Sequence, residues 1–313
     1  MATLVAPDHC DPFVDAEALR KACQGWGTDE KGIIEVICHR NAAQRKVIKE
    51  TYEQQYSENL IKRLEDELSG DFERAVYRWM LEPYEREAVL ANVALKKSDY
   101  KVIIELSCTP SAEELLLFKR AYQARYLHSL EEDVASYFTG DMRKLLLLLV
   151  SVHRHESEVT DPKLAETEAE ILHNCIKDKE YNHDEIVRIL TTRSKSQLIA
   201  TFYQFRDAHG SPITKSLAGD KDQDFVSALH TVIRCIKSPI KYLERVLSHA
   251  MHTRGTDEDA ITRVLVTRAE KDLAKVEELF YKRNSVTLEH AIAKETRGDY
   301  ERFLLTILGK LHH

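Results

Sequence analysis

Apolar residues recur along this chain at the spacing of amphipathic helices. Leu60, Leu64 and Leu68, for example, fall four residues apart on what would be one helical face. Alternation of apolar and polar residues, typical of strands, is scarce. Ten glycines and seven prolines are few for 313 residues, and they avoid the interiors of the long periodic segments. The pattern predicts an all-α protein.

The helical pattern occurs in four similar copies. Ile33-Ile34-x-Val36-Ile37 followed by Arg40 is the first, and further copies begin 70, 153 and 228 residues later. A Gly-Asp pair within Ser69–Phe72 recurs at the first and third of these offsets. Each copy has room for about five short helices, and such internal similarity is the signature of a repeat architecture. In the first copy, helices are expected at Gln44–Gln55, at Glu58–Leu68 and from Asp71 onward.

The copies divide the chain into repeats with a longer step in the middle. Residues 153–161 are polar and poor in apolar residues, which favours an exposed connector between two halves. The residues 311–313 resemble an expression-tag remnant. The predicted divisions are a short N-terminal segment (1–14), repeats 1 and 2 (15–83 and 84–153), the connector (154–167), and repeats 3 and 4 (168–238 and 239–310).

Composition restricts the partners and the compartment. The formal net charge of −7 argues against a general nucleic-acid binder and against unaided attraction to an anionic membrane. The N-terminus has neither a basic region nor an apolar stretch typical of a signal peptide. The longest apolar run, Leu145–Val150, is much shorter than the ~20 residues of a spanning helix. We therefore expect a cytoplasmic protein whose six cysteines, with no C-x-x-C spacing, are free thiols.

Two glycine-bearing stretches stand out, Cys23–Glu30 (C-Q-G-W-G-T-D-E) and Met251–Glu258 (M-H-T-R-G-T-D-E). In each, a helical pattern stops, a turn follows, and Thr-Asp-Glu precedes the next helix. We expect the threonine to be the N-cap and the acids to lie in the first turn, where the helix dipole favours them. A loop of this kind turns carbonyl oxygens outward.

The four copies, the G-x-G-T-D-E loop and the acid before the S-G-D-F turn together resemble the annexin family, and most closely its plant branch. The resemblance covers about Asp15 to Gly309. It implies four five-helix repeats that form one curved disc. It also implies a peripheral protein that binds anionic phospholipid membranes in a calcium-dependent manner, with Ca²⁺ bridging protein and lipid phosphate.

The resemblance further implies the ligands of two calcium ions. In annexins, three loop carbonyls and a carboxylate 42 residues after the first loop glycine hold the ion. In repeat 1 these positions are Cys23, Gly25, Gly27 and Glu67. In repeat 4 they are Met251, Thr253, Gly255 and Glu295. Thr253 departs from the usual glycine, so the second loop is expected to turn at a higher energetic cost.

The middle repeats lack this combination. In repeat 2, Lys96–Asp99 replaces the glycine loop and Tyr137 takes the position of the acid. Repeat 3 keeps an acid, Asp220, but its loop is Asp178–Tyr181. We expect no comparable site in either repeat.

Two loop side chains are candidates for membrane contact. Trp26 suits the headgroup region of a bilayer, where one edge of the ring is apolar and the other wet, although it could instead pack on its own repeat. Arg254, its counterpart, could meet a lipid phosphate. Arg40, Arg193 and Arg268 recur at one place in repeats 1, 3 and 4, where repeat 2 has Pro110, and are expected to bind acids or helix-end carbonyls internally.

Other functions remain open as alternatives. Cys108 and Cys235 match two cysteines proposed to be redox-active in plant annexins, and a peroxidase role has been suggested for a histidine placed like His39. Two buried thiols and a structural histidine are the simpler interpretations. The nucleotide-binding pattern G-x-x-x-x-G-K-[ST] is absent. F-actin is a further candidate partner that no motif supports. We predict no catalytic residues and no enzymatic activity.

Overall fold

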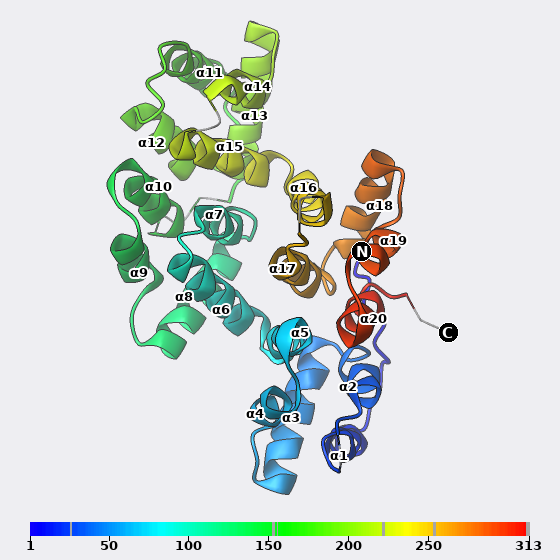
Figure 1. Cartoon of the computed structure of the whole chain (residues 1–313). Helices are drawn as coiled ribbons and strands as arrows, with labels where there is room; N and C mark the ends of the chain where they lie inside the picture. The colour runs from blue at the N-terminus through cyan, green and yellow to red at the C-terminus, as the bar shows by residue number, and fades with distance from the viewer. Residues whose placement is uncertain (26, 152–153, 155, 221–222, 253–254, 311–313) are drawn as a thin grey trace. The chain divides into compact units, whose positions relative to one another are not determined.

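The computed structural model describes residues 1–25, 27–151, 154, 156–220, 223–252 and 255–310, and these form twenty α-helices and one 3₁₀ helix without any strand (Figure 1). The predicted all-α class is therefore confirmed. The chain forms two compact units. Unit 1 comprises Met1–Arg86 and Ile240–His313, and unit 2 comprises Glu87–Pro239.

Unit 1 combines the first and last repeats, although they lie at opposite ends of the sequence. The helices of repeat 1 are α1 (Pro12–Ala22), α2 (Glu30–Ile37), α3 (Ala42–Tyr56), α4 (Leu60–Glu67) and α5 (Gly70–Met80). Those of repeat 4 are α16 (Pro239–His252), α17 (Glu258–Arg268), α18 (Leu273–Asn284), α19 (Leu288–Glu295) and α20 (Gly298–Ile307). Helix α2 packs against α20, and α5 packs against both α17 and α20. The predicted five helices per repeat are present here.

Unit 2 combines repeats 2 and 3 by equivalent contacts, since α7 packs against α15 and α10 packs against α12. The helices of repeat 2 are α6 (Pro83–Lys96), α7 (Tyr100–Cys108), α8 (Ala112–Tyr126), α9 (Leu130–Tyr137) and α10 (Gly140–Ser151). Those of repeat 3 are α11 (Pro162–Lys177), α12 (Asp184–Thr192), α13 (Lys195–His209), α14 (Ile213–Ser216), the 3₁₀ helix η1 (Leu217–Asp220) and α15 (Asp224–Lys237). The fourth helix of repeat 3 is thus shortened.

The longest apolar run belongs to the core of unit 2. Within Leu145–Val150, the side chains of Leu145, Leu146, Leu149 and Val150 are buried in α10. Among the described residues, no helix is both long and apolar enough to cross a membrane.

The predicted connector does not separate two compact halves. Helix α11 begins at Pro162, so the irregular stretch before it is shorter than residues 154–167. Both flanking helices, α10 and α11, belong to unit 2, and the chain passes between units near Arg86 and Pro239 instead. The reason is that repeat 1 packs against repeat 4. This contact cannot be predicted from the order of the repeats along the chain.

A buried guanidinium ties repeat 1 to repeat 4 inside unit 1. Arg86 is 3% exposed, and it donates from Nε to Arg78 O at 2.7 Å and from Nη1 to Val266 O at 2.5 Å. Its Nη2 donates to the carbonyls of Trp79 and Leu81, both at 3.2 Å. The carbonyls at the end of α5, which no helical N–H can reach, are thereby paired.

The N-terminal segment lies against repeat 4. The Thr3 N–H donates to Ala269 O at 2.9 Å, and its hydroxyl donates to Ile307 O at 2.8 Å. Gly309 has φ +77°, and a Cβ there would lie 2.6 Å from Thr3 O. Glycine is therefore required at this position for the close approach of the two backbones.

We expect Arg86→Met to lower the free energy of unfolding by about 3 kcal/mol, because buried carbonyls on both repeats lose their donor. Urea denaturation followed by circular dichroism measures this change. Arg74→Ala, which removes an exposed ion pair with Asp71, is the control and should cost no more than about 0.5 kcal/mol. Equal effects of the two substitutions would contradict the assigned role of Arg86.

Candidate metal-binding loops

The glycine loops of repeats 1 and 4 are closed in the same way. The Asp29 N–H donates to Ala22 O at 2.9 Å, and the Asp257 N–H donates to Ala250 O at 3.0 Å. Each aspartate then caps the following helix, because its side chain accepts from Gly32 N at 3.0 Å or from Ala260 N at 2.9 Å. The prediction that threonine is the N-cap is therefore wrong. The aspartate after it takes that role and leaves the threonine hydroxyl available.

The threonine hydroxyls bind the predicted acids. Thr28 Oγ1 donates to Glu67 Oε2 at 2.8 Å, and Thr256 Oγ1 donates to Glu295 Oε2 at 3.2 Å. Glu67 and Glu295 are the last residues of α4 and α19. The fold thus brings each acid to the loop of its own repeat and fixes one of its oxygens. This role of the threonines was missed in the sequence, where their position favoured a cap.

Glycine is needed in both loops. Gly25, Gly27 and Gly255 have φ values of +110°, +89° and +87°, a region that residues with a Cβ rarely adopt. Cys23 is buried as the C-cap of α1, and Met251 lies in α16. The predicted ligand Thr253 and the predicted membrane contacts Trp26 and Arg254 lie outside the described residues.

In repeat 1 a positive charge lies between two of the predicted ligands. Arg63 Nη2 is 2.6 Å from Glu67 Oε1, and the same nitrogen donates to Cys23 O. A carbonyl oxygen and a carboxylate oxygen therefore converge on one cationic atom. Oxygen donors of these two kinds suit Ca²⁺, so the residues present fit this ion. The sequence held a signal for Arg63, since it precedes Glu67 by four residues and so shares its helix face.

No group of three or more His, Cys, Asp or Glu side chains suited to a metal ion occurs among the described residues. A site built from backbone carbonyls and one carboxylate does not contain such a group. The predicted ligands of repeats 1 and 4 are of that kind.

Acidic side chains surround the space beside both loops. A cavity of about 480 Å³ in unit 1 is lined by both Glu67 and Glu295. Its other acids are Glu30, Asp71, Glu258 and Asp299. Arg297 also lines the cavity, but its Nη1 donates to backbone carbonyls, including Thr296 O at 2.6 Å. Such a surface attracts cations and repels a phosphate unless a cation intervenes.

In the middle repeats the backbone bond that closes the turn encloses two residues fewer than in repeats 1 and 4. Asp99 N donates to Ala94 O and Glu180 N donates to Cys175 O, both at 2.8 Å, and no glycine lies between the bonded residues. In repeat 2 Asp99 then caps α7, whereas in repeat 3 the loop continues to His183, the N-cap of α12. Tyr137, at the end of α9, occupies the position that an acid takes in repeat 1.

The three recurring arginines bind acids inside their own repeats, as predicted. Arg40 pairs with Asp15 through Nε and Nη2, both at 2.7 Å. Arg193 Nε lies 2.8 Å from Glu168, and Arg268 Nε lies 2.7 Å from Asp272. These six side chains therefore have structural partners.

The candidate redox cysteines are buried free thiols. Cys108 and Cys235 are each 1% exposed on α7 and α15. Burial raises the pKa of Cys108 to about 11. His39 follows α2 and contacts the end of that helix, with Nδ1 2.9 Å from Glu35 O. A thiol with a raised pKa is a poor nucleophile, because the thiolate is the reactive form.

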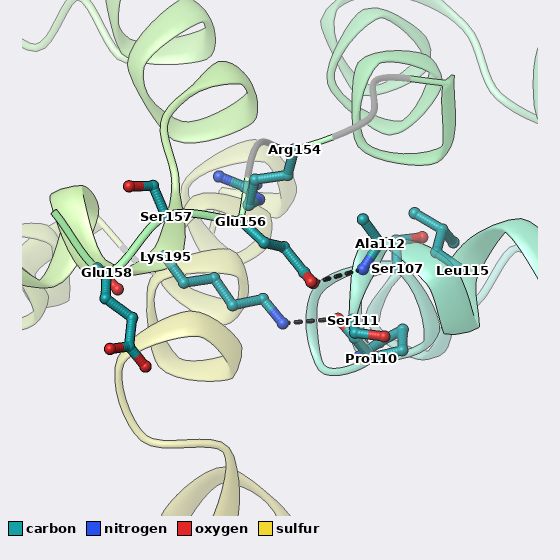
Figure 2. A pocket seen from close by; sticks show the side chains of 11 residues that line it. Ser107, Pro110, Ser111, Ala112, Leu115, Arg154, Glu156, Ser157, Glu158 and Lys195 are labelled. Carbon is teal, nitrogen blue, oxygen red and sulfur yellow. Dashed lines mark hydrogen bonds between the residues drawn. The ribbon is translucent and has the colours of Figure 1, made fainter.

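Figure 2 shows a second cavity, of about 390 Å³, in unit 2. Three of its charged side chains bind backbone groups. Lys195 Nζ donates to Pro110 O at 2.6 Å, Arg154 Nη2 donates to Leu190 O at 2.8 Å, and Glu156 accepts from Ala112 N at 2.7 Å. These contacts attach residues 154 and 156 to α8 and α12, so we assign them a structural role.

This is an all-α repeat protein whose first and last repeats each hold a glutamate against a glycine-bearing loop. The annexin family model matches residues 14–79, 87–149, 167–232 and 242–307, and the chain belongs to the annexin family, among its plant-type members. Annexins are known as calcium-dependent phospholipid-binding proteins.

Similar proteins span the whole chain. Annexin-like protein RJ4 from Fragaria ananassa is 59% identical over 312 residues, which are 99% of each chain. Annexin D7 from Arabidopsis thaliana is 48% identical over 316 residues, covering 100% of both. A solved structure of annexin III has a TM-score of 0.92 at 33% identity and covers 98% of this chain and 97% of its own. Chicken annexin V in complex with Zn²⁺ has a TM-score of 0.92 at 31% identity, covering 99% and 98%.

The burial of the cysteines predicts their reactivity. At pH 8 a thiol reagent should rapidly label only Cys10, which is partly exposed, whereas all six cysteines should react in denaturant. With a pKa of about 11, Cys108 is ionised in only about one molecule in a thousand at this pH. Mass spectrometry of the labelled peptides measures the pattern, and Cys10→Ser should remove the rapid labelling. Rapid labelling of Cys108 or Cys235 would instead favour the redox function.

Proposed function

We propose that this protein binds Ca²⁺ at the loops of repeats 1 and 4 and, through these ions, the phosphates of anionic phospholipids. The observation that carries the proposal is the pair of equivalent hydrogen bonds, from Thr28 to Glu67 and from Thr256 to Glu295. Each bond holds a carboxylate against a loop whose glycines adopt positive φ. Repeats 2 and 3, whose loops contain no glycine, are not part of the proposed site.

The proposed ligands leave room for lipid. Three carbonyls and a bidentate carboxylate supply about five of the six to eight oxygens that Ca²⁺ prefers. In repeat 1 the proposed donors are Cys23, Gly25, Gly27 and Glu67, and in repeat 4 they are Met251, Thr253, Gly255 and Glu295. About one to three coordination positions remain for phosphate oxygens. The lipid thus completes the coordination of the ion.

Charge explains why the ion is required. The formal net charge is −7, and six acids line the cavity beside the loops. Calcium bound there converts repulsion from an anionic membrane into attraction. With one carboxylate per ion, we expect affinity without lipid on the order of 10⁻⁴–10⁻³ M. Lipid and calcium then each raise the affinity of the other by the same factor.

We further propose that the protein is cytoplasmic and binds the membrane surface reversibly. Trp26 and Arg254 are assigned to lipid contact from their positions in the two loops. We assign no catalytic step to the protein.

Co-sedimentation with vesicles tests the proposal. We expect the wild type to pellet with phosphatidylserine vesicles but not with phosphatidylcholine vesicles, and only when calcium is present. Glu67→Gln and Glu295→Gln should each raise the calcium concentration for half-maximal binding by about tenfold, because each removes the only charged ligand of one ion. The double variant should not pellet.

Asp66→Asn is the matched control, since it makes the same change of charge at the exposed residue next to Glu67. It should bind like the wild type. Co-sedimentation that does not depend on calcium, or that persists in the double variant, would overturn the proposal.

A further inference from the structure

We propose that Arg63 is a built-in competitor of calcium: its guanidinium occupies the repeat 1 site in the ion-free protein, and Ca²⁺ has to displace it. The inference rests on the proposed function and deepens it, because it makes the two sites respond to different calcium concentrations. It goes beyond the ligand set that the family resemblance implies, in which no arginine takes part.

The guanidinium of Arg63 lies where two of the proposed calcium ligands converge. Its Nη2 lies 2.6 Å from Glu67 Oε1 and also donates to Cys23 O. Calcium binds oxygens at about 2.3–2.6 Å, so an ion held by the same two oxygens would need nearly the same position. The two positive charges would also repel each other. Arg63 and Ca²⁺ therefore exclude each other at this place.

The surroundings offer the displaced guanidinium another position. Its Nη1 is 4.0 Å from Glu58 Oε1, an oxygen of a second carboxylate. Its Nε is buried and has no hydrogen-bond partner among the described residues, so the present contacts do not use all of its donors. The side chain is 29% exposed, which leaves it a route toward solvent.

Repeat 4 has no guanidinium at the position that corresponds to Arg63. The residue 228 positions after Arg63 is Ala291, so α19 carries a methyl group where α4 carries a guanidinium. Glu295 keeps its bond to Thr256, as Glu67 does to Thr28. At the first site Arg63 already neutralises the charge of the acid, whereas no basic side chain among the described residues pairs with Glu295. Repeat 4 should therefore take up calcium first and repeat 1 only at a higher concentration.

Calorimetric calcium titration of the lipid-free full chain tests the inference in two backgrounds. In Glu295→Gln only the repeat 1 site remains, and adding Arg63→Ala should tighten its calcium binding by about tenfold, because the ion no longer displaces a charge-assisted bond. In Glu67→Gln only the repeat 4 site remains, and the same substitution should leave its affinity unchanged. Arg63→Gln, which keeps a donor but not the charge, should behave like Arg63→Ala.

A transfer experiment supplies a second, independent variant. Ala291→Arg in the Glu67→Gln background should weaken calcium binding at repeat 4, while Ala291→Met, which adds size without charge, should weaken it less. Thermal unfolding provides a readout without calcium. In a chelator Arg63→Ala should melt below the wild type, and added calcium should raise its melting temperature by more than that of the wild type.

The outcomes separate the inference from the proposed function. Unchanged or weaker calcium binding at repeat 1 after Arg63→Ala would overturn the inference alone, since a weaker site would mean that Arg63 positions Glu67 for the ion. Absence of calcium binding to the wild type and to every variant would overturn the proposed function as well.

Discussion

Each repeat has to turn the chain from its first helix into its second while keeping the backbone groups of the loop paired. A backbone hydrogen bond helps to meet this requirement in each repeat, from the N–H of a loop residue to a carbonyl near the end of the first helix. The bond encloses two residues more in repeats 1 and 4 than in repeats 2 and 3. Where two further residues are accommodated, as in Cys23–Asp29, the loop contains glycines at positive φ and faces an acid. Closure of the loop is thus a matter of folding, and its extra length is available for binding.

The pairing of the first repeat with the last gives these loops a common setting. Helix α5 packs on α17 and α20, Arg86 bonds carbonyls of both repeats, and the N-terminal segment lies against repeat 4. Glu67 and Glu295 consequently line one acidic cavity. Under the proposed function, the two loops share a unit and a negative field and are therefore suited to act together at one surface. The repeats of unit 2 contribute packing without a glycine-bearing loop of this kind.

The two loops have equivalent backbone hydrogen bonds, but the charges beside their acids differ. The same threonine-to-glutamate bond occurs in both, yet α4 places a guanidinium beside its acid and α19 places a methyl group at the corresponding position. The sequence predicted a higher conformational cost for the loop of repeat 4 than for that of repeat 1, because Thr253 replaces a glycine. Under the competition we propose, the neighbouring helix outweighs the loop in deciding which site fills first.

Helical periodicity and repeated spacing are local properties that one chain displays directly, so the all-α class, the four repeats, the family and the two loops with their acids could be predicted from the sequence. The sequence also indicated internal partners, acids or helix-end carbonyls, for Arg40, Arg193 and Arg268. It did not show that Asp29 rather than Thr28 caps α2, that Arg63 reaches Cys23 O, or that repeat 1 packs with repeat 4. The physical reason is that these contacts join residues on different helices, and their geometry depends on how α4 and its neighbours pack rather than on any spacing along the chain.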